Sequence, residues 1–236
     1  MIILESILSF DLAVFKFIQD YIYQDWLSPI MEFITTIGEG GVIFIIAGLV
    51  MMCFKKTRKA GVVALGSLLI MSVLNNVILK DIMNRPRPFN LVTNDQTGFF
   101  GLINWNIDHL PELKQDWIDI YRYPYIVKQP SSLSFPSGHT SSAFAFMAGA
   151  SFVIKKWKFS VPAYLFAALM GFTRLYLAVH YPTDVIGGAI AGILYALIGL
   201  LVFGKLYDVV YPKIEKKIVE YKEKKKAEAK ADAKSK

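Results

Sequence analysis

The sequence predicts an all-α membrane protein, a polytopic bundle of five to six transmembrane helices. Hydrophobic residues make up 54% of its 236 residues and the mean hydropathy is +0.42, which is more apolar than a soluble domain of this size. Its apolar runs also approach the roughly 20 residues needed to cross a hydrocarbon core. Three runs come close to that length alone, and two shorter ones need a few flanking residues: Ala60–Leu79, Phe159–Val179 and Val185–Gly204, then Gly41–Phe54 and Ser141–Ile154.

The first helix, expected over residues 4–20, is amphipathic and has no clean apolar run. Four of its polar residues fall on one stripe at 100° per residue: Glu5, Ser9, Lys16 and Asp20. Asp11 lies off that stripe. Such a helix lies in the membrane interface or crosses the membrane within a bundle, and the sequence leaves both open. We divide the chain into this segment (1–24), a membrane domain (25–204) and a basic tail (205–236).

The basic residues are placed unevenly, and their placement predicts the orientation. The net charge is +7, and three basic clusters stand out: Lys55–Lys59, Lys155–Lys158 and the tail after Lys205. Because Lys/Arg-rich loops stay cytoplasmic, segments 80–137 and 180–184 are expected on the external face of the plasma membrane. The tail is helix-prone in its first half and otherwise expected to be a disordered solubilising segment.

The external segment 89–133 is polar and carries five aromatic residues: Trp105, Trp117, Tyr121, Tyr123 and Tyr125. Trp and Tyr favour the headgroup level, so this insert is expected to lie against the membrane surface or over the site. An ordered loop with a few packed aromatics is an equal alternative.

Three clusters of ionisable residues fall at helix ends on the external side, where such residues are costly and usually functional. In the first, K-x6-R-P, Lys80 and Arg87 lie two helical turns apart, so both can face the same way. Two fixed cations at the mouth of a bundle suit an anion such as phosphate. Basic residues also anchor spans at the interface, and this cluster alone does not decide between the two.

The second cluster, P-S-G-H, marks the start of a helix. Ser137 is expected as its N-cap, and Gly138 allows close backbone approach to a ligand. The free N–H groups of a helix start form an anion site, and His139 lies just inside it. A lone histidine is more often structural than catalytic.

The third cluster, R-x5-H-x3-D, pairs His180 with Asp184. A carboxylate that accepts a hydrogen bond from one ring nitrogen fixes the tautomer and raises the basicity of the other. Arg174 and His180 lie about 240° apart on a continuous helix, so they converge only if the helix stops. Tyr181-Pro182 is expected to supply that stop. The alternative is a buried polar pair that packs spans together.

In this order, the three clusters resemble the type-2 phosphatidic acid phosphatase superfamily, which also includes bacterial undecaprenyl pyrophosphate phosphatases and vanadium haloperoxidases. The resemblance covers roughly residues 28–204 and implies the helical core of those proteins. It departs at Thr173, where the family usually has Ser. Because threonine keeps the hydroxyl, activity is expected to be retained.

The resemblance also implies the roles of the site residues. His180 is expected to attack phosphorus and form a phosphohistidine, with Asp184 orienting it and His139 acting as general acid and then base. The remaining members are expected to hold the phosphate oxygens: Lys80, Arg87, Arg174 and the backbone N–H groups of Ser137 and Gly138. We expect no metal and no cofactor, since Cys53 is the only cysteine and His109 is expected to be a loop residue.

An external site suits a membrane lipid whose phosphate lies at the headgroup level. Undecaprenyl pyrophosphate is favoured; phosphatidylglycerol phosphate, phosphatidic acid and lipid A phosphate also fit, and nothing points to nucleic acid. A lipid phosphotransferase and a non-catalytic membrane binding protein are the alternatives, and a haloperoxidase is disfavoured because the spans leave no soluble surface. The oligomeric state is not readable, since Gly187, Gly188, Ala189 and Gly192 permit close helix packing within or between chains.

Overall fold

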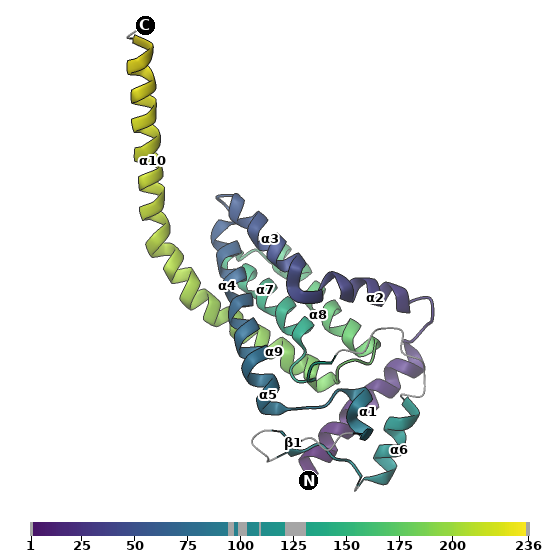
Figure 1. Cartoon of the computed structure of the whole chain (residues 1–236). Coiled ribbons are helices and arrows are strands. Elements are labelled where there is room, and N and C mark those ends of the chain that lie inside the picture. The colour runs from purple at the N-terminus through teal and green to yellow at the C-terminus, as the bar shows by residue number, and fades with distance from the viewer. Residues whose placement is uncertain (1, 94–96, 99–102, 109, 121–130, 235–236) are drawn as a thin grey trace.

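The structure, a computed structural model, describes residues 2–93, 97–98, 103–108, 110–120 and 131–234 and is mostly helical (Figure 1). Ten α-helices are described: α1 (Ile2–Tyr21), α2 (Ser28–Ile37), α3 (Val42–Cys53), α4 (Arg58–Val73), α5 (Lys80–Met83), α6 (Pro111–Ile120), α7 (Gly138–Ile154), α8 (Trp157–Tyr176), α9 (Pro182–Gly199) and α10 (Lys205–Lys234). Two-residue strands, β1 (Thr97–Gly98) and β2 (Ile103–Asn104), pair antiparallel in the insert. The predicted all-α class is confirmed.

Each predicted apolar run is helical over most of its length, and two helices continue through π-helical turns. Leu74–Leu79 joins α4 to α5, and Leu200–Gly204 joins α9 to α10. Within the described residues, three helical stretches are long and apolar enough to cross a membrane: Ser28–Cys53, Arg58–Leu91 and Pro182–Lys225. The count of five to six spans stays a prediction.

Helix α7 lies at the centre of the bundle and packs against α4, α8 and α9. Its contact with α9 is close because small residues face each other. A Cβ added at Gly192 would lie 2.7 Å from Ser141 O and 3.0 Å from Ala145 N, and one at Gly188 would lie 2.9 Å from Ser137 O. These glycines therefore pack within the chain.

Helix α1 packs its apolar face against α6, α8 and α9. Leu8, Phe15 and Ile18 are buried on this face, and Asp11 is fully buried among them. The predicted polar stripe is exposed. Asp11 therefore points inward, which explains why it falls off that stripe.

The insert residues Trp105 and Trp117 are both buried. The Trp117 ring lies edge-on to Phe15 and Tyr181, with centroids 5.6 and 5.5 Å away. For these two tryptophans the packed-loop alternative holds, because neither is left to meet lipid headgroups. Tyr121, Tyr123, Tyr125 and His109 lie outside the described residues.

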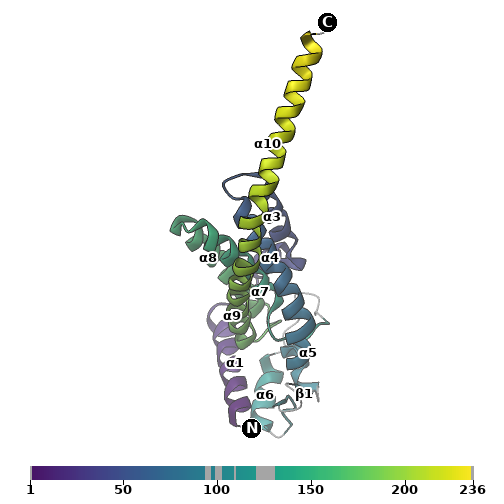
Figure 2. The same ribbon diagram turned by 90° about the vertical axis from the view of Figure 1, so that its left-hand side faces the viewer.

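The tail is helical to Lys234, further than expected, and Figure 2 shows α10 extending away from the bundle. The prediction of a mostly disordered tail is wrong because its Ala, Glu and Lys residues are strong helix formers. Two ion pairs fix the base of α10 to the α3–α4 turn: Lys59–Asp208 at 2.7 Å and Lys55–Glu215 at 3.3 Å. Two of the three basic clusters thus lie at one end of the molecule, opposite α1, α6 and β1 (Figure 1).

Candidate active site

The third polar cluster occupies a turn between α8 and α9. Helix α8 ends at Tyr176, and Ala178 has a left-handed φ of +51°. The N–H of Val179 then donates to Arg174 O at 3.1 Å. The expected stop at Tyr181-Pro182 is wrong by several residues. Pro182 instead begins α9, a position where its missing N–H costs nothing.

His180 is held by a partner at each ring nitrogen. Its Nδ1 lies 3.4 Å from Asp184 Oδ2 and 3.4 Å from Ser134 Oγ, and its Nε2 lies 3.0 Å from Arg87 Nη1. Because a guanidinium only donates, Nε2 is the acceptor and Nδ1 carries the proton. Asp184 Oδ2 also accepts hydrogen bonds from the Ser134 hydroxyl and from the Tyr181 N–H.

The electrostatic surroundings keep His180 neutral. Burial lowers the pKa of His180 well below its ordinary value of 6.5, and the charges of Arg87 and Arg174 lower it further. Lys80 and His139 act in the same direction. All three polar clusters therefore meet around one imidazole, which carries a lone pair on Nε2 at neutral pH.

Arg87 reaches this point from outside the helix. The helix ends at Met83, and Asn84 has a left-handed φ of 41°, so the expected two-turn helical spacing from Lys80 does not exist. Arg87 is fixed instead by Ser132, whose carbonyl and hydroxyl oxygens lie 2.7 and 2.8 Å from Nε and Nη2, and by Val179 O, 2.8 Å from Nη1. The prolines on either side, Pro86 and Pro88, suit this extended path.

The second cluster begins α7 as predicted, with different hydrogen bonds. Ser137 is the N-cap residue but makes no side-chain capping bond; its hydroxyl accepts a hydrogen bond from Thr140 Oγ1 at 2.9 Å. Its N–H donates to Asp184 O at 3.1 Å. The expectation that this N–H is free for an anion is therefore wrong in this state. Gly138 and His139 face a cavity.

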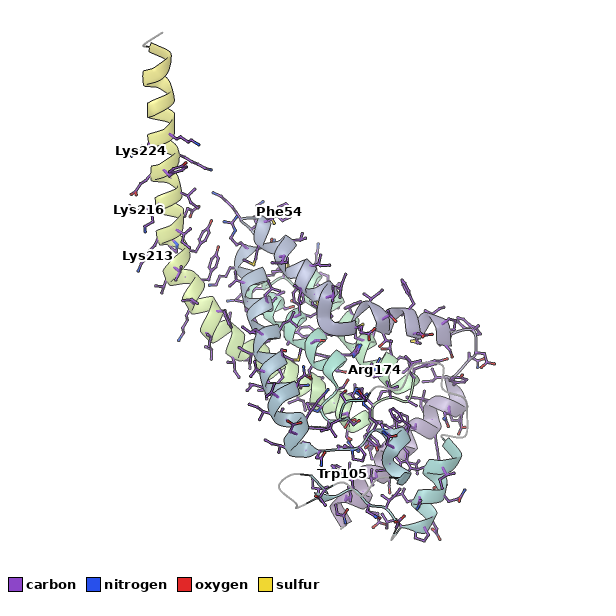
Figure 3. All side chains as sticks on the ribbon, in the orientation of Figure 1. Phe54, Trp105, Arg174, Lys213, Lys216 and Lys224 are labelled. Carbon is purple, nitrogen blue, oxygen red and sulfur yellow. The ribbon has the colours of Figure 1, made fainter. Side chains whose placement is uncertain are left out.

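Arg174 lies in the last turn of α8 and is buried in the bundle, where it donates to the Thr35 hydroxyl of α2 (Figure 3). Its neighbour Thr173, where the family usually has Ser, is fully buried, and its hydroxyl donates to Met170 O at 2.8 Å within α8. The hydroxyl thus serves the helix, and threonine performs that task as serine would.

A cavity of about 450 Å³ opens beside His139. Its polar end is formed by Asn76, Gly138, His139 and Ser142, and the rest is lined mainly by apolar residues of α3 and α4, including Ile45, Leu65, Leu68 and Leu69. Its lining does not include His180 or the cations Lys80, Arg87 and Arg174. The cavity suits a ligand with a polar head and an apolar chain.

The sequence matches the PAP2 superfamily over residues 61–208, a range that contains all three polar clusters. The chain belongs to the PAP2 superfamily.

Several relatives of this PAP2 chain have named activities. It is 29% identical over 188 residues to an undecaprenyl-diphosphatase of Sulfolobus acidocaldarius, covering 80% of this chain and 76% of the relative. It is 33% identical over 108 residues to phosphatidylglycerophosphatase B of Bacillus subtilis, covering 41% of this chain and 53% of the relative.

Solved structures show the same fold. The crystal structure of a transmembrane PAP2 type phosphatidylglycerolphosphate phosphatase from Bacillus subtilis is 27% identical and superimposes with a TM-score of 0.58, covering 82% of this chain and 84% of that one. LpxE of Aquifex aeolicus, at 23% identity and a TM-score of 0.58, supports the fold alone.

Four residues of this PAP2 site escaped sequence analysis, among them Ser132, which binds Arg87. Ser134 binds Asp184, and Arg85 joins Asp184 to Asp11 of α1. The available signals were a second arginine in R-P-R-P and an acidic residue on an apolar helix face. Among the described residues, no group of three His, Cys, Asp or Glu side chains is placed to hold a metal ion.

Proposed function

We propose that this PAP2 protein is a membrane lipid phosphatase, that it acts through a phosphohistidine on His180, and that undecaprenyl pyrophosphate is its favoured substrate. The observation that carries the proposal is the hydrogen bonding of His180. With Asp184 and Ser134 on Nδ1, the Nε2 lone pair points to a cluster of cations suited to a phosphate.

The reaction proceeds in two displacements. Burial and the charges of Arg174, Arg87 and Lys80 lower the pKa of His139 to about 3, and the negative charge of a bound phosphate counters those cations, so His139 takes up a proton as the substrate binds. The lone pair of His180 Nε2 then forms the N–P bond while the bond from phosphorus to the leaving oxygen breaks, and protonated His139 gives that oxygen its proton. His139 then takes a proton from water, which attacks phosphorus, breaks the N–P bond and releases inorganic phosphate. Asp184 stabilises the positive charge that His180 acquires in the intermediate.

Cationic side chains supply the electrostatic stabilisation. Arg87, Arg174 and Lys80 surround His180, and the Ser137 hydroxyl and Gly138 N–H lie at the start of α7. These groups supply the positive charge that a metal ion supplies to phosphate oxygens in other phosphatases. We therefore propose a metal-independent reaction.

The cavity and the relatives support the choice of substrate. Of the proposed site residues, Gly138 and His139 line the cavity, and the rest of its lining includes leucines of α4, so we propose that it takes the apolar chain of a lipid whose phosphate lies beside His139. The undecaprenyl-diphosphatase of Sulfolobus acidocaldarius matches 80% of this chain and supports a prenyl pyrophosphate, and the phosphatidylglycerolphosphate phosphatase from Bacillus subtilis, which covers 82%, makes a glycerolipid the second candidate. We place the site on the external face, because the basic α3–α4 turn and α10 lie at the opposite end.

The test is phosphate release from undecaprenyl pyrophosphate, phosphatidylglycerol phosphate and phosphatidic acid by purified protein in detergent, with EDTA present. His180→Ala is compared with His109→Ala, a histidine outside the three polar clusters. We expect EDTA-resistant release, fastest from undecaprenyl pyrophosphate, that is lost only in His180→Ala. Full activity in His180→Ala would overturn the mechanism, and release only when an acceptor lipid is added would indicate a phosphotransferase.

A further inference from the structure

A buried ion bridge links helix α1 to the proposed nucleophile. Arg85 Nη1 lies 2.8 Å from Asp184 Oδ1, and Arg85 Nη2 lies 2.7 Å from Asp11 Oδ2. Arg85 is 2% exposed, and both carboxylates are fully buried. One guanidinium is therefore shared between Asp184, which faces His180, and an aspartate 173 positions earlier in the chain (184 − 11).

Thr183 closes this bridge into a ring. Its hydroxyl donates to Asp11 Oδ2 at 2.8 Å and accepts from Arg85 Nη1 at 2.7 Å. Its N–H donates to Asp11 Oδ1 at 2.9 Å. Asp11 thus holds both the side chain that binds Asp184 and the backbone one residue before Asp184.

Arg85 is also fixed from its other sides. Its guanidinium lies over the Tyr181 ring, 3.7 Å from the centroid, and its carbonyl oxygen accepts the Ser134 N–H at 2.9 Å. Ser134 in turn donates to Asp184 Oδ2, the oxygen nearest His180 Nδ1. Arg85 therefore supports both groups that hold the Nδ1 side of the imidazole.

We infer that Asp11 and Arg85 are positioning residues for His180: they fix Asp184 against Nδ1 and set how strongly Asp184 attracts its proton. This inference rests on the proposed role of His180. The positive charge of Arg85 alone would offset the negative electrostatic potential that Asp184 creates at the imidazole. Because Asp11 shares Arg85, Asp184 keeps enough negative charge to stabilise the imidazolium that forms during the reaction. Helix α1 is thus part of the active site.

A purely structural ion pair would only dock α1, and the chain offers one for comparison. Lys16 of α1 and Asp116 of α6 lie 3.1 Å apart, and each side chain is 47% exposed. This pair also joins α1 to a neighbouring segment, at the surface and with the cation on α1, whereas the buried bridge has its anion on α1. Loss of the Lys16–Asp116 pair tests docking without touching the bridge to Asp184.

Several charged or titratable groups face His180, and any shift in its titration is read against all of them. They come from α1, α5, the segment after α5, α7, α8 and α9: Asp11 (through Arg85), Lys80, Arg85, Arg87, His139, Arg174 and Asp184. Only Asp11 and Arg85 are changed in the main experiment below, so the charges of the other groups stay the same.

The experiment measures the titration of His180 directly. The chain has three histidines, so ¹⁵N-histidine labelling of the full-length protein in detergent gives few signals, and His180→Ala assigns the one of interest. We expect Arg85→Gln to raise the pKa of His180, because a nearby positive charge is lost, by about one pH unit. Adding Asp11→Asn to Arg85→Gln removes a negative charge as well, and we expect the pKa to fall back.

Lys16→Gln is expected to leave the titration unchanged. If Arg85→Gln titrates as the wild type does, Asp11 and Arg85 only dock α1 and the inference is overturned. If Arg85→Gln fails to fold, Arg85→Lys keeps the charge but cannot reach both carboxylates, and Thr183→Val removes one hydroxyl. A shift in either against an unchanged Lys16→Gln supports the inference, and no shift in both overturns it.

A kinetic arm separates this inference from the proposed function. We expect Asp11→Asn to lower kcat roughly tenfold while KM stays within about twofold, since positioning acts on the chemical step. Wild-type release of phosphate with an unaltered kcat in Asp11→Asn would overturn the inference and leave the proposed function intact. Absence of release in the wild type would overturn the proposed function, and the titration still decides the link between Asp11, Arg85 and His180.

Discussion

Arg87 Nη1 lies 3.0 Å from His180 Nε2, so the guanidinium covers the nitrogen that we propose attacks phosphorus. The same Nη1 also donates to Val179 O at 2.8 Å. A phosphate that approaches Nε2 must therefore meet Arg87 first, and its oxygens offer the guanidinium a charged acceptor in place of the neutral ring. We therefore expect substrate binding to be coupled to exposure of the proposed nucleophile through this one side chain.

Arg87→Lys tests this coupling. Lysine keeps the charge but not the planar fork that binds Ser132 and His180 together, so we expect kcat/KM to fall by about 100-fold. Steady-state phosphate release measures the loss. Arg58→Lys, which alters an arginine beside Tyr211 at the opposite end, is the matched control and should retain activity. Equal activity in both variants would contradict the assigned role of Arg87.

The pH dependence follows from the lowered pKa of His180. Burial and neighbouring cations keep the imidazole neutral below its ordinary value of 6.5, so the acidic limb of kcat/KM set by His180 should lie well below pH 6.5. The same lowered pKa also makes the stability of the fold depend on pH. The unfolded chain takes up this proton near pH 6.5 and the folded chain does not, so the free energy of unfolding should decrease as the pH falls through 6.5. Kinetic and thermal-unfolding series over pH 4.5–8 measure the two effects, and a limb above pH 6.5 would contradict the assignment.

The fold and the three polar clusters were readable from the sequence because they depend on local patterns. Apolar runs of membrane length became helices, and Lys80, Arg87, His139, Arg174 and His180 were brought together. Helix ends were less accurate. Ala178 adopts a left-handed backbone conformation, which an alanine in the sequence does not indicate.

Partners from distant segments could not be read at all. Asp11 and Arg85 meet because α1 packs against α9. This contact joins distant segments, and no periodic pattern in the sequence indicates it. Ser132 and Ser134, which bind Arg87 and Asp184, lie in an irregular stretch before α7. What the sequence did show was an anomaly, an aspartate on the apolar side of an amphipathic helix.

Gly192→Ala tests the packing of α9 on α7. The new Cβ would lie 2.7 Å from the backbone oxygen of Ser141, which cannot rotate away as a side chain can. We therefore expect the free energy of unfolding to fall by about 1–3 kcal/mol. Gly204→Ala, at the end of the π-helical turn that follows α9, is the control, because the nearest atom to its new Cβ would be Leu200 Cδ1 at 3.3 Å. Thermal unfolding in detergent compares the two, and an equal or higher midpoint for Gly192→Ala would show that α9 moves freely off α7.

The orientation is tested by cysteine labelling in a Cys53→Ser background. Lys56→Cys, in the exposed α3–α4 turn, should react with a membrane-impermeant maleimide only after cells are permeabilised. Glu112→Cys, exposed at the start of α6, should react in intact cells. The reverse pattern would place the proposed site on the cytoplasmic side and would remove the argument for an external substrate.

The cavity predicts a variant that separates lipid substrates from soluble ones. Ser72 lines it, so Ser72→Trp places an indole where we propose the apolar chain lies. We expect KM for undecaprenyl pyrophosphate to rise roughly tenfold, because the lost apolar contact is worth about one or two kilocalories per mole. Hydrolysis of para-nitrophenyl phosphate should be unchanged. Val73→Trp is the matched control, since Val73 is exposed and does not line the cavity. If Ser72→Trp slows both substrates equally, the cavity holds the phosphate group and the chain lies elsewhere. If neither changes, the lipid enters by another route.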